Sequence, residues 1–148
     1  MFIGRYYYQL EEKGRVSLPK VFRETTDDWI VTRGLDGGLF VFPAEGFEQR
    51  LADLPAKSFT KKTNRDFVRL MVNDAKSVSP DNNGRILLPD YLIELAQLQK
   101  QVVIVGSLTY LEIWDQERYH AYLDQLGPQA ETIAENLEEN DAHQRLAD

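Results

Sequence analysis

The sequence predicts an α+β fold made of two copies of one small unit, and two observations lead to it. Residues 11–19 return as residues 81–89, with glycine, arginine and proline in matching places at an offset of 70 residues. The strand pattern at residues 30–34 then returns at residues 102–106, at an offset of 72 residues. A repeat of this length indicates duplication of one supersecondary unit. We expect each copy to contain a hairpin of two strands that pair with each other, a short helix, two more strands and a closing helix.

The composition is that of a globular protein without a membrane span. The chain has 148 residues, of which 43% are hydrophobic, which is enough to bury a core. It holds no run of eighteen apolar residues, and its first residues lack the apolar segment of a secretory signal, so we expect neither a span nor a signal. The absence of cysteine excludes disulfides and thiolate metal sites and fits a reducing compartment.

The charge is unevenly distributed along the chain. A net charge of −7 argues against a nucleic-acid partner when it is taken for the whole chain. Residues 127–148, however, hold six acidic residues and one basic residue, whereas the other 126 residues hold 18 acidic and 16 basic ones. A body so close to neutral leaves room for a basic face.

The first copy begins with a strand and a tight turn. Tyr6, Tyr8 and Leu10 alternate with more polar positions over residues 5–11, which predicts a strand with one aromatic face buried. A turn that ends in glycine follows, and residues 15–18 form the return strand.

A short helix and two strands come next. Proline suits the first position of a helix, so Pro19 predicts a helix over residues 20–25 with Val21 and Phe22 as its anchors. Residues 29–33 are predicted as a strand that a glycine-rich loop joins to a second strand at residues 39–42.

The closing helix of the first copy has apolar side chains at positions i, i+4 and i+7. These are Phe47, Leu51 and Leu54. The spacing predicts one buried helical face.

A basic segment, residues 55–72, separates the copies and matches neither of them. Its only acidic residue is Asp66. Its basic residues are Lys57, Lys61, Lys62, Arg65 and Arg69. Phe67, Leu70 and Met71 share one helical face, so the second half is predicted as an amphipathic helix that faces the core. Its basic side suits either phosphate or solvent, and the sequence leaves both readings open.

The second copy repeats this order. Asn83 and Gly84 predict a type I′ turn, because both central residues of that turn need positive φ. A strand at residues 86–88 leads through Pro89 into a helix with Asp90 at its positive end. The apolar residues of this helix and the segment after it are Leu92, Ile93, Leu95, Ala96 and Leu98.

Two strands and two helices complete the chain. The β-branched run at residues 102–105 predicts a strand buried on both faces. A strand at residues 110–114 and a helix at residues 116–126 follow. The acidic tail, residues 127–148, has few apolar anchors and is predicted as a solvated helix or a frayed end.

The chemistry lies in the two turns. Glu11 and Arg15 stand four positions apart, and so do Asp81 and Arg85. Each pair can form an ion pair, or the carboxylate can accept turn N–H groups while it orients the arginine. The alternative is that both pairs only close the turns. Lys13 adds a second cation beside Arg15, which makes the first turn the better contact for phosphate or base.

The sequence offers little to a catalytic or metal-binding reading. Its only histidines are His120 and His143, which are too few for a histidine-rich metal site and are not part of a Ser-His-Asp pattern. No glycine-rich phosphate loop is present. We therefore expect no enzymatic activity, no metal and no cofactor.

Three stretches together resemble the MraZ family, a bacterial branch of the AbrB-like swapped-hairpin proteins. They are the opening Met1-Phe2-x-Gly4 and the two turn segments, residues 13–19 and 81–89. The resemblance covers about residues 1–126. It implies two fused AbrB-like swapped-hairpin β-barrel halves with short flanking helices and pseudo-two-fold symmetry. The expected divisions are an AbrB-like unit at 1–54, a basic inter-repeat helix at 55–72, a second unit at 73–126 and an acidic tail at 127–148.

The resemblance also implies a function. It suggests a cytoplasmic, nucleoid-associated transcriptional regulator that binds direct repeats in the promoter of the division and cell-wall gene cluster, as a closed ring of identical subunits. Its partner would be double-stranded DNA, and promoter occlusion favours repression over activation. The competing hypothesis is a non-enzymatic module for protein interaction or assembly.

The resemblance supplies the motif arginines, and the basic residues of the first turn and of residues 55–72 supply the other expected site residues. The family signature Asp-x-x-x-Arg is present as Asp81 and Arg85, whereas Glu11 replaces the aspartate in the first copy. The expected DNA-binding residues are Arg15, Lys13, Arg5 and Arg85. The acids Glu11 and Asp81 would orient the arginines, and Gly14 and Gly84 would shape the turns. Further phosphate contacts are expected from Lys61, Lys62 and Arg65. Arg85 is expected to matter less than Arg15, because Asn82 and Asn83 stand where the first turn has Glu12 and Lys13.

Overall fold

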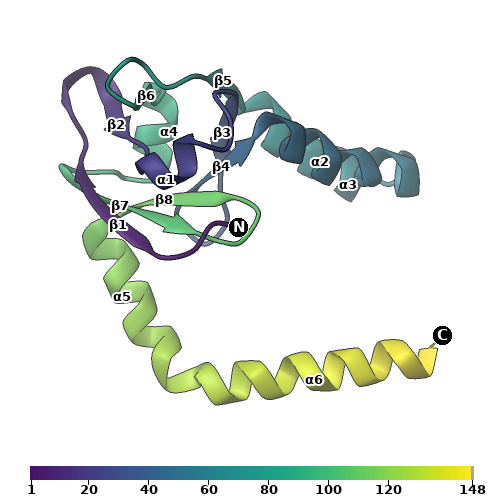
Figure 1. The fold of residues 1–148 in the computed structure, drawn as a ribbon. Coiled ribbons are helices and arrows are strands. Elements are labelled where there is room, and N and C mark those ends of the chain that lie inside the picture. The colour runs from purple at the N-terminus through teal and green to yellow at the C-terminus, as the bar shows by residue number, and fades with distance from the viewer. Residues whose placement is uncertain (148) are drawn as a thin grey trace. The chain divides into compact units, whose positions relative to one another are not determined.

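The chain is a mixed α+β protein in two compact units, Met1–Gln116 and Glu117–Asp148 (Figure 1). The computed structural model describes the backbone of residues 1–147 and the side chains of residues 1–52 and 59–146. The strands are β1 (Arg5–Gln9), β2 (Arg15–Ser17), β3 (Trp29–Arg33), β4 (Leu39–Pro43), β5 (Lys76–Val78), β6 (Arg85–Leu87), β7 (Gln101–Gly106) and β8 (Leu111–Asp115). The helices are η1 (Glu12–Gly14), α1 (Lys20–Arg23), α2 (Ala44–Ser58), α3 (Lys62–Asn73), α4 (Asp90–Leu95), α5 (Gln116–Leu126), η2 (Gly127–Gln129) and α6 (Ala130–Ala147).

The strands form two antiparallel sheets. Six of them lie in the order β1-β7-β8-β4-β3-β5, and β2 and β6 form a separate two-stranded sheet. The larger sheet is open, because β1 and β5 are its edges and no pairing joins them in the described part of the chain. The α+β class predicted from the duplication is confirmed.

Strand pairing crosses from one copy of the repeat to the other. The first strand of each copy pairs with the third strand of the other copy, so β1 pairs with β7 and β5 with β3. The equivalent strands β2 and β6 pair with each other, as do β4 and β8. Exchanging the copies leaves this set of pairings unchanged. The predicted turns are therefore correct, but the prediction that their flanking strands pair with each other is wrong.

The core explains why the strands pair in this way. Val16 of β2 lies opposite Ile86 of β6, and both side chains are fully buried. Neither three-residue strand has enough apolar surface to be stable alone, so the two bury their single central residues together. Tyr6, Tyr8 and Leu10 pack against the same core, which confirms the predicted aromatic face of β1.

Some predicted apolar anchors are exposed instead. Phe22 is buried, but the side chain of Val21 is 55% exposed, because α1 spans a single turn and presents only one side chain to the core. Leu70, which is predicted to face the core, is 47% exposed, whereas Met71 beside it is buried. The predicted anchor Leu54 lies outside the described side chains, and so does Lys57.

The basic segment between the copies is divided between two helices. The closing helix α2 runs to Ser58, and the amphipathic helix α3 begins at Lys62. The buried hydroxyl of Thr32 on β3 donates a hydrogen bond of 2.6 Å to the carbonyl of Met71, which ties the end of α3 to the sheet. Figure 1 shows α2 and α3 on the β3 and β4 side of the body, away from β2 and β6.

The second unit consists of helices. Every described side chain of α6 is exposed, as expected for the acidic tail in its reading as a solvated helix. Among the described helices, none combines the length and the apolar character needed to cross a bilayer.

Candidate nucleic-acid interface

The two turns that carry the repeated motif have the same backbone scaffold. In the first turn, the Glu11 N–H donates to the Arg15 carbonyl at 2.8 Å, and the Gly14 N–H donates to the Glu11 carbonyl at 3.2 Å. In the second turn, the equivalent bonds from Asp81 and Gly84 are both 2.9 Å long. The copies therefore close their turns with the same backbone hydrogen bonds, although the backbone between these bonds differs at Lys13 and Asn83.

The glycines fix each turn to the opposite copy. Gly14 has a φ of 82° and Gly84 a φ of 78°, values that other residues adopt only under strain. The Gly14 carbonyl accepts a 2.8 Å bond from the Leu88 N–H, and the Gly84 carbonyl accepts one of 3.0 Å from the Leu18 N–H. A Cβ atom on Gly14 would lie 2.7 Å from the Leu88 carbonyl oxygen. Both positions therefore require glycine.

The predicted type I′ geometry at Asn83 is wrong. Positive φ occurs at Gly84 but not at Asn83 in the second turn, because the Asp81 carboxylate accepts the Asn83 N–H and holds a different turn. In the first turn Lys13 takes a φ of 67°, although lysine tolerates this region poorly. The lysine is therefore held in place by the backbone bonds on either side of it.

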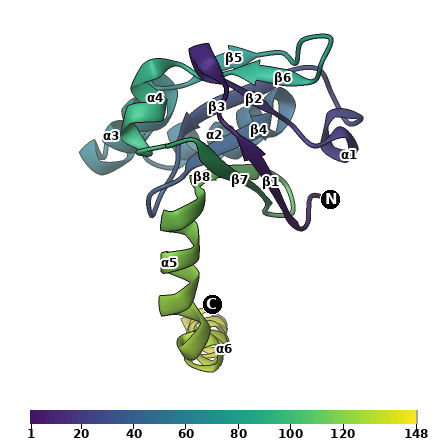
Figure 2. The ribbon, with the colours of Figure 1, turned by 90° about the vertical axis from the view of Figure 1, so that its left-hand side faces the viewer.

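Both motif arginines lie on one face of the two-stranded sheet. Arg15 is opposite Leu87, and Arg85 is opposite Ser17. Residues two apart on a strand share a face, so this face carries Arg15 and Arg85 while Val16 and Ile86 fill the core on the other. Figure 2 shows β2 and β6 side by side at the rim of the body. The structure therefore brings the two arginines to one surface.

The second turn is closed by its own aspartate. The Asp81 Oδ1 atom accepts the N–H groups of Asn83 and Arg85 at 2.9 and 3.0 Å, and Oδ2 accepts the Arg85 Nε–H at 3.2 Å. These bonds, above all the one from the Arg85 backbone, lower the pKa of Asp81 below its ordinary value. Asp81 therefore bonds both the backbone of its own turn and the side chain of Arg85.

The acid of the first turn bonds a different arginine from the one that the sequence predicts. The Glu11 Oε2 atom accepts a 2.7 Å hydrogen bond from the Arg85 Nη1 atom, 74 residues away, and does not pair with Arg15. Chiefly through this bond, the pKa of Arg85 is raised above its ordinary value. The expected Glu11 and Arg15 pair is thus replaced by a contact between the copies.

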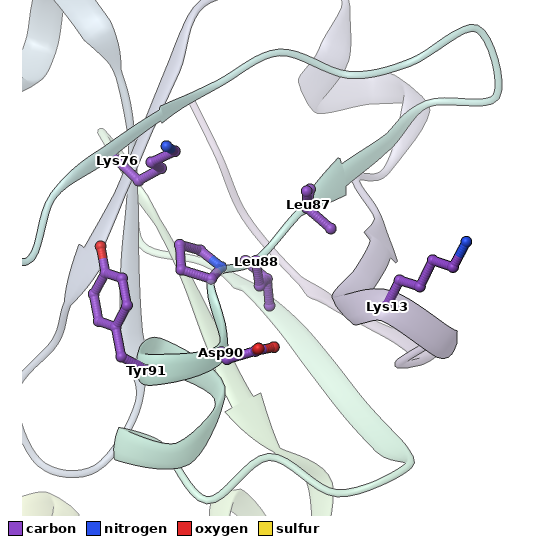
Figure 3. A pocket seen from close by; sticks show the side chains of 7 residues that line it. Lys13, Lys76, Leu87, Leu88, Asp90 and Tyr91 are labelled. Atoms are coloured by element: carbon purple, nitrogen blue, oxygen red, sulfur yellow. The ribbon is translucent and has the colours of Figure 1, made fainter.

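The first turn presents two cations that no described side chain bonds. Lys13 is exposed and Arg15 is half-buried, and within the described part of the chain neither side chain forms a hydrogen bond or ion pair. Lys13 borders an open cavity of about 380 Å³ whose other lining residues include Lys76, Leu87 and Tyr91. Figure 3 shows Lys13 on one side of this cavity, with Lys76 and Tyr91 on the other.

The remaining predicted contact residues lie elsewhere. Arg5 is exposed at the start of β1, at the opposite end of the strand from the turn. Lys61, Lys62 and Arg65 belong to the start of α3, on the side of the body away from β2 (Figure 1). Lys62 pairs with Asp66, and the Arg65 Nη1 atom donates to the Phe59 carbonyl at 3.1 Å. The structure does not bring these residues to the two turns.

One residue beside the site escaped the sequence analysis. The guanidinium of Arg23 lies against Gly84, where a Cβ atom would collide with it, and its Nε atom donates to the Leu18 carbonyl at 2.9 Å. Arg23 therefore supports the second turn from the first copy. Nothing in its sequence context distinguishes it from an ordinary solvent-facing residue of a short helix.

The chemistry of this surface is electrostatic. Glu11 and Asp81 are exposed and bonded to Arg85, and the lowered pKa of Asp81 makes it a poor proton donor near neutral pH. The described residues include no cluster of three or more histidine, cysteine, aspartate or glutamate side chains suited to a metal ion. What the arrangement offers is a set of positive groups on a rigid turn.

Comparison with known proteins points to one family. Residues 1–70 and 71–143 each match the family described as "MraZ protein, putative antitoxin-like", which agrees with the internal duplication. The chain is 41% identical over 141 residues to a protein of Moorella thermoacetica named "Transcriptional regulator MraZ", with 93% of this chain and 96% of the relative covered. A protein of the same name from Carboxydothermus hydrogenoformans is 43% identical over 138 residues, with the same coverage.

Proposed function

The chain belongs to the MraZ family, and on that premise we propose that it is a sequence-specific DNA-binding transcriptional regulator that represses by occupying a promoter. The observation that carries the proposal is the first turn, where Lys13 and Arg15 have no bonding partner in the described part of the chain. Cations of this kind neutralise DNA phosphates, and an arginine can also bind a guanine edge with two hydrogen bonds. Gly14 fixes the backbone of the turn, so DNA binding would have to order the arginine side chain but not the backbone beneath it.

We propose that the fold is a pair of AbrB-like swapped-hairpin barrel halves related by a pseudo-two-fold axis. The pairing of β1 with β7 and of β3 with β5 supports it, because each copy lends its first strand to the other. The central pairs β2 with β6 and β4 with β8 would lie on the axis. The two motif turns then stand together because of the symmetry. In this scheme the functional divisions are residues 1–54, 55–72, 73–126 and 127–148.

The active form in this proposal is a closed ring of identical subunits on direct promoter repeats. One subunit offers few phosphate contacts, and each contact contributes only about 0.9 to the salt dependence of log K. A single subunit would therefore bind DNA weakly at physiological salt. Repeated identical turns that meet repeated DNA sites would convert weak contacts into tight binding.

The other predicted contact residues have secondary roles in this proposal. Arg5 and the α3 residues Lys61, Lys62 and Arg65 lie away from the first turn, so they would contact phosphates flanking the site or DNA held by a neighbouring subunit. Phosphate contacts of this kind add affinity without adding sequence preference.

The proposed target is the promoter of the division and cell-wall gene cluster, and the proposed place of action is the cytoplasmic nucleoid. We propose no catalytic role. Both motif carboxylates are exposed and ion-paired, whereas a catalytic carboxylate is usually set apart by a pocket and a raised pKa.

The test is binding of the purified full chain to a fragment of its own gene cluster's promoter across a salt series. We expect salt-dependent binding by the wild type and a loss of at least about tenfold for Arg15→Ala, the range of one good arginine contact. The control is Arg145→Ala, which removes the same charge from the exposed helix α6 and is expected to bind like the wild type. Light scattering confirms that all three proteins have the same mass.

The outcomes separate the two hypotheses. If neither the wild type nor Arg145→Ala binds the promoter at any salt while the assembly persists, the regulator proposal is wrong and the assembly module is favoured. If Arg15→Ala binds as tightly as the wild type, the regulator proposal survives only with another contact surface.

A further inference from the structure

The two copies of the motif use their arginines differently. In the second turn, Arg85 donates a hydrogen bond from Nη1 to Glu11 at 2.7 Å and another from Nε to Asp81 at 3.2 Å. In the first turn, no described side chain bonds Arg15. Both arginines lie on one face of the small sheet, next to turns closed by the same backbone hydrogen bonds, and the acids are the groups that bond one arginine and not the other.

The length of the acidic side chain explains the asymmetry. The short carboxylate of Asp81 stays inside its own turn, where it accepts the N–H groups of Asn83 and Arg85. Glu11 is longer by one methylene group, and its carboxylate leaves its own turn and reaches the arginine of the other copy. The pairing of β2 with β6 places the two turns close enough for this contact.

The contact gives the two turns different local charge. Arg85 with Glu11, Asp81 and the adjacent Arg23 carries no net charge, and two of the Arg85 guanidinium nitrogens are occupied. Lys13 and Arg15 with Glu12 carry a net charge of +1, and no described side chain bonds the guanidinium of Arg15. A phosphate is therefore attracted more strongly to the first turn than to the second.

We propose that Glu11 determines which arginine contacts DNA. Its ion pair with Arg85 keeps that arginine from binding phosphate, so each subunit contacts the duplex through the first turn alone. This inference rests on the proposed DNA-binding function. Glu11 acts through Arg85 and is therefore a positioning residue. Removing its charge leaves the Nη1 atom at most a weaker, neutral hydrogen bond that a phosphate can displace, while Asp81 still bonds the guanidinium through Nε.

The inference has a measurable consequence in the salt dependence of binding. A released Arg85 adds one phosphate contact per subunit, which steepens the plot of log K against log salt by about 0.9 for each subunit bound. Between 50 and 200 mM salt, a further slope of this size is about a 3.5-fold additional loss of affinity per subunit.

The experiment is a double-mutant cycle on the full chain with the labelled promoter duplex as the probe. The proteins are the wild type, Glu11→Gln, Arg85→Ala and the double variant Glu11→Gln/Arg85→Ala. Glu12→Gln is the matched control, since it removes the same charge from the adjacent exposed residue. Light scattering and circular dichroism confirm that each protein keeps the wild-type assembly and fold.

We expect Arg85→Ala alone to change affinity less than twofold and to leave the salt slope unchanged. Glu11→Gln is expected to steepen the slope by about 0.9 per bound subunit, and the double variant to return to the wild-type slope. Glu12→Gln is expected to keep the wild-type slope.

Other outcomes overturn the inference in distinguishable ways. In one such outcome, the wild type binds the promoter and Arg85→Ala loses as much affinity as Arg15→Ala. This result contradicts the role of Glu11 and leaves the proposed function standing. The same holds if Glu11→Gln steepens the slope equally with and without Arg85, or if Glu12→Gln has the same effect. A wild type that binds at no salt refutes the proposed function and this inference with it.

Discussion

Replacement of Gly14 by alanine is expected to destabilise the fold by about 0.5–3 kcal/mol. A φ of 82° costs an alanine about 1–2 kcal/mol. The new Cβ atom would lie 2.7 Å from the Leu88 carbonyl oxygen, so the backbone must shift at the cost of the Gly14 to Leu88 hydrogen bond, about 0.5–1.5 kcal/mol. The smaller conformational freedom of alanine in the unfolded chain returns about 0.4–1 kcal/mol.

The assay is denaturation by urea, followed by tryptophan fluorescence at one fixed protein concentration. Trp29 and Trp114 are only 1% and 3% exposed, so their emission reports loss of the core. The concentration is fixed because association with other subunits would add to the apparent stability.

The matched control is Gly46→Ala in helix α2. A Cβ atom on Gly46 would meet no atom within 4 Å, and alanine is the better helix former, so this variant is expected to gain up to about 1 kcal/mol. Equal effects of the two substitutions, or a loss below about 0.5 kcal/mol at Gly14, would refute the reasoning that the turn is locked against the other copy.

Two carboxyl groups are expected to give opposite dependences of stability on pH. The turn N–H bonds lower the folded pKa of Asp81, so its contribution to stability is present above its ordinary pKa of about 4 and is lost as the pH falls through the folded value. Asp81→Asn should therefore be less stable than the wild type at pH 7, and this difference in stability should disappear on acidification. Burial raises the pKa of Glu112, so the wild type should lose stability as the pH rises from about 4 through the folded pKa. Glu112→Gln should therefore be more stable than the wild type at pH 7 but not at pH 3. Urea titrations at a series of pH values measure both, and a gap that does not change with pH would contradict either assignment.

Much of the secondary structure follows from local patterns. The β-branched run of β7 is buried at four successive positions, Val102 to Val105, because a strand covered on both faces must be apolar throughout. Strand β3 and helix α5 have the bounds that their sequence patterns predict. The predictions that Val21 and Leu70 face the core are wrong, because apolar spacing does not reveal which part of a short helical face the core will cover.

The sequence by itself determined the duplication, the α+β class, the positions of the two glycine turns and the family. These depend on residue type and spacing, which are local properties of the chain. Only the tertiary structure decided which strands pair and which arginine each acid holds. Glu11 and Arg85 are 74 residues apart, and they meet because β2 pairs with β6 to bury Val16 against Ile86. A motif spacing of four residues cannot reveal a partner that long-range packing supplies.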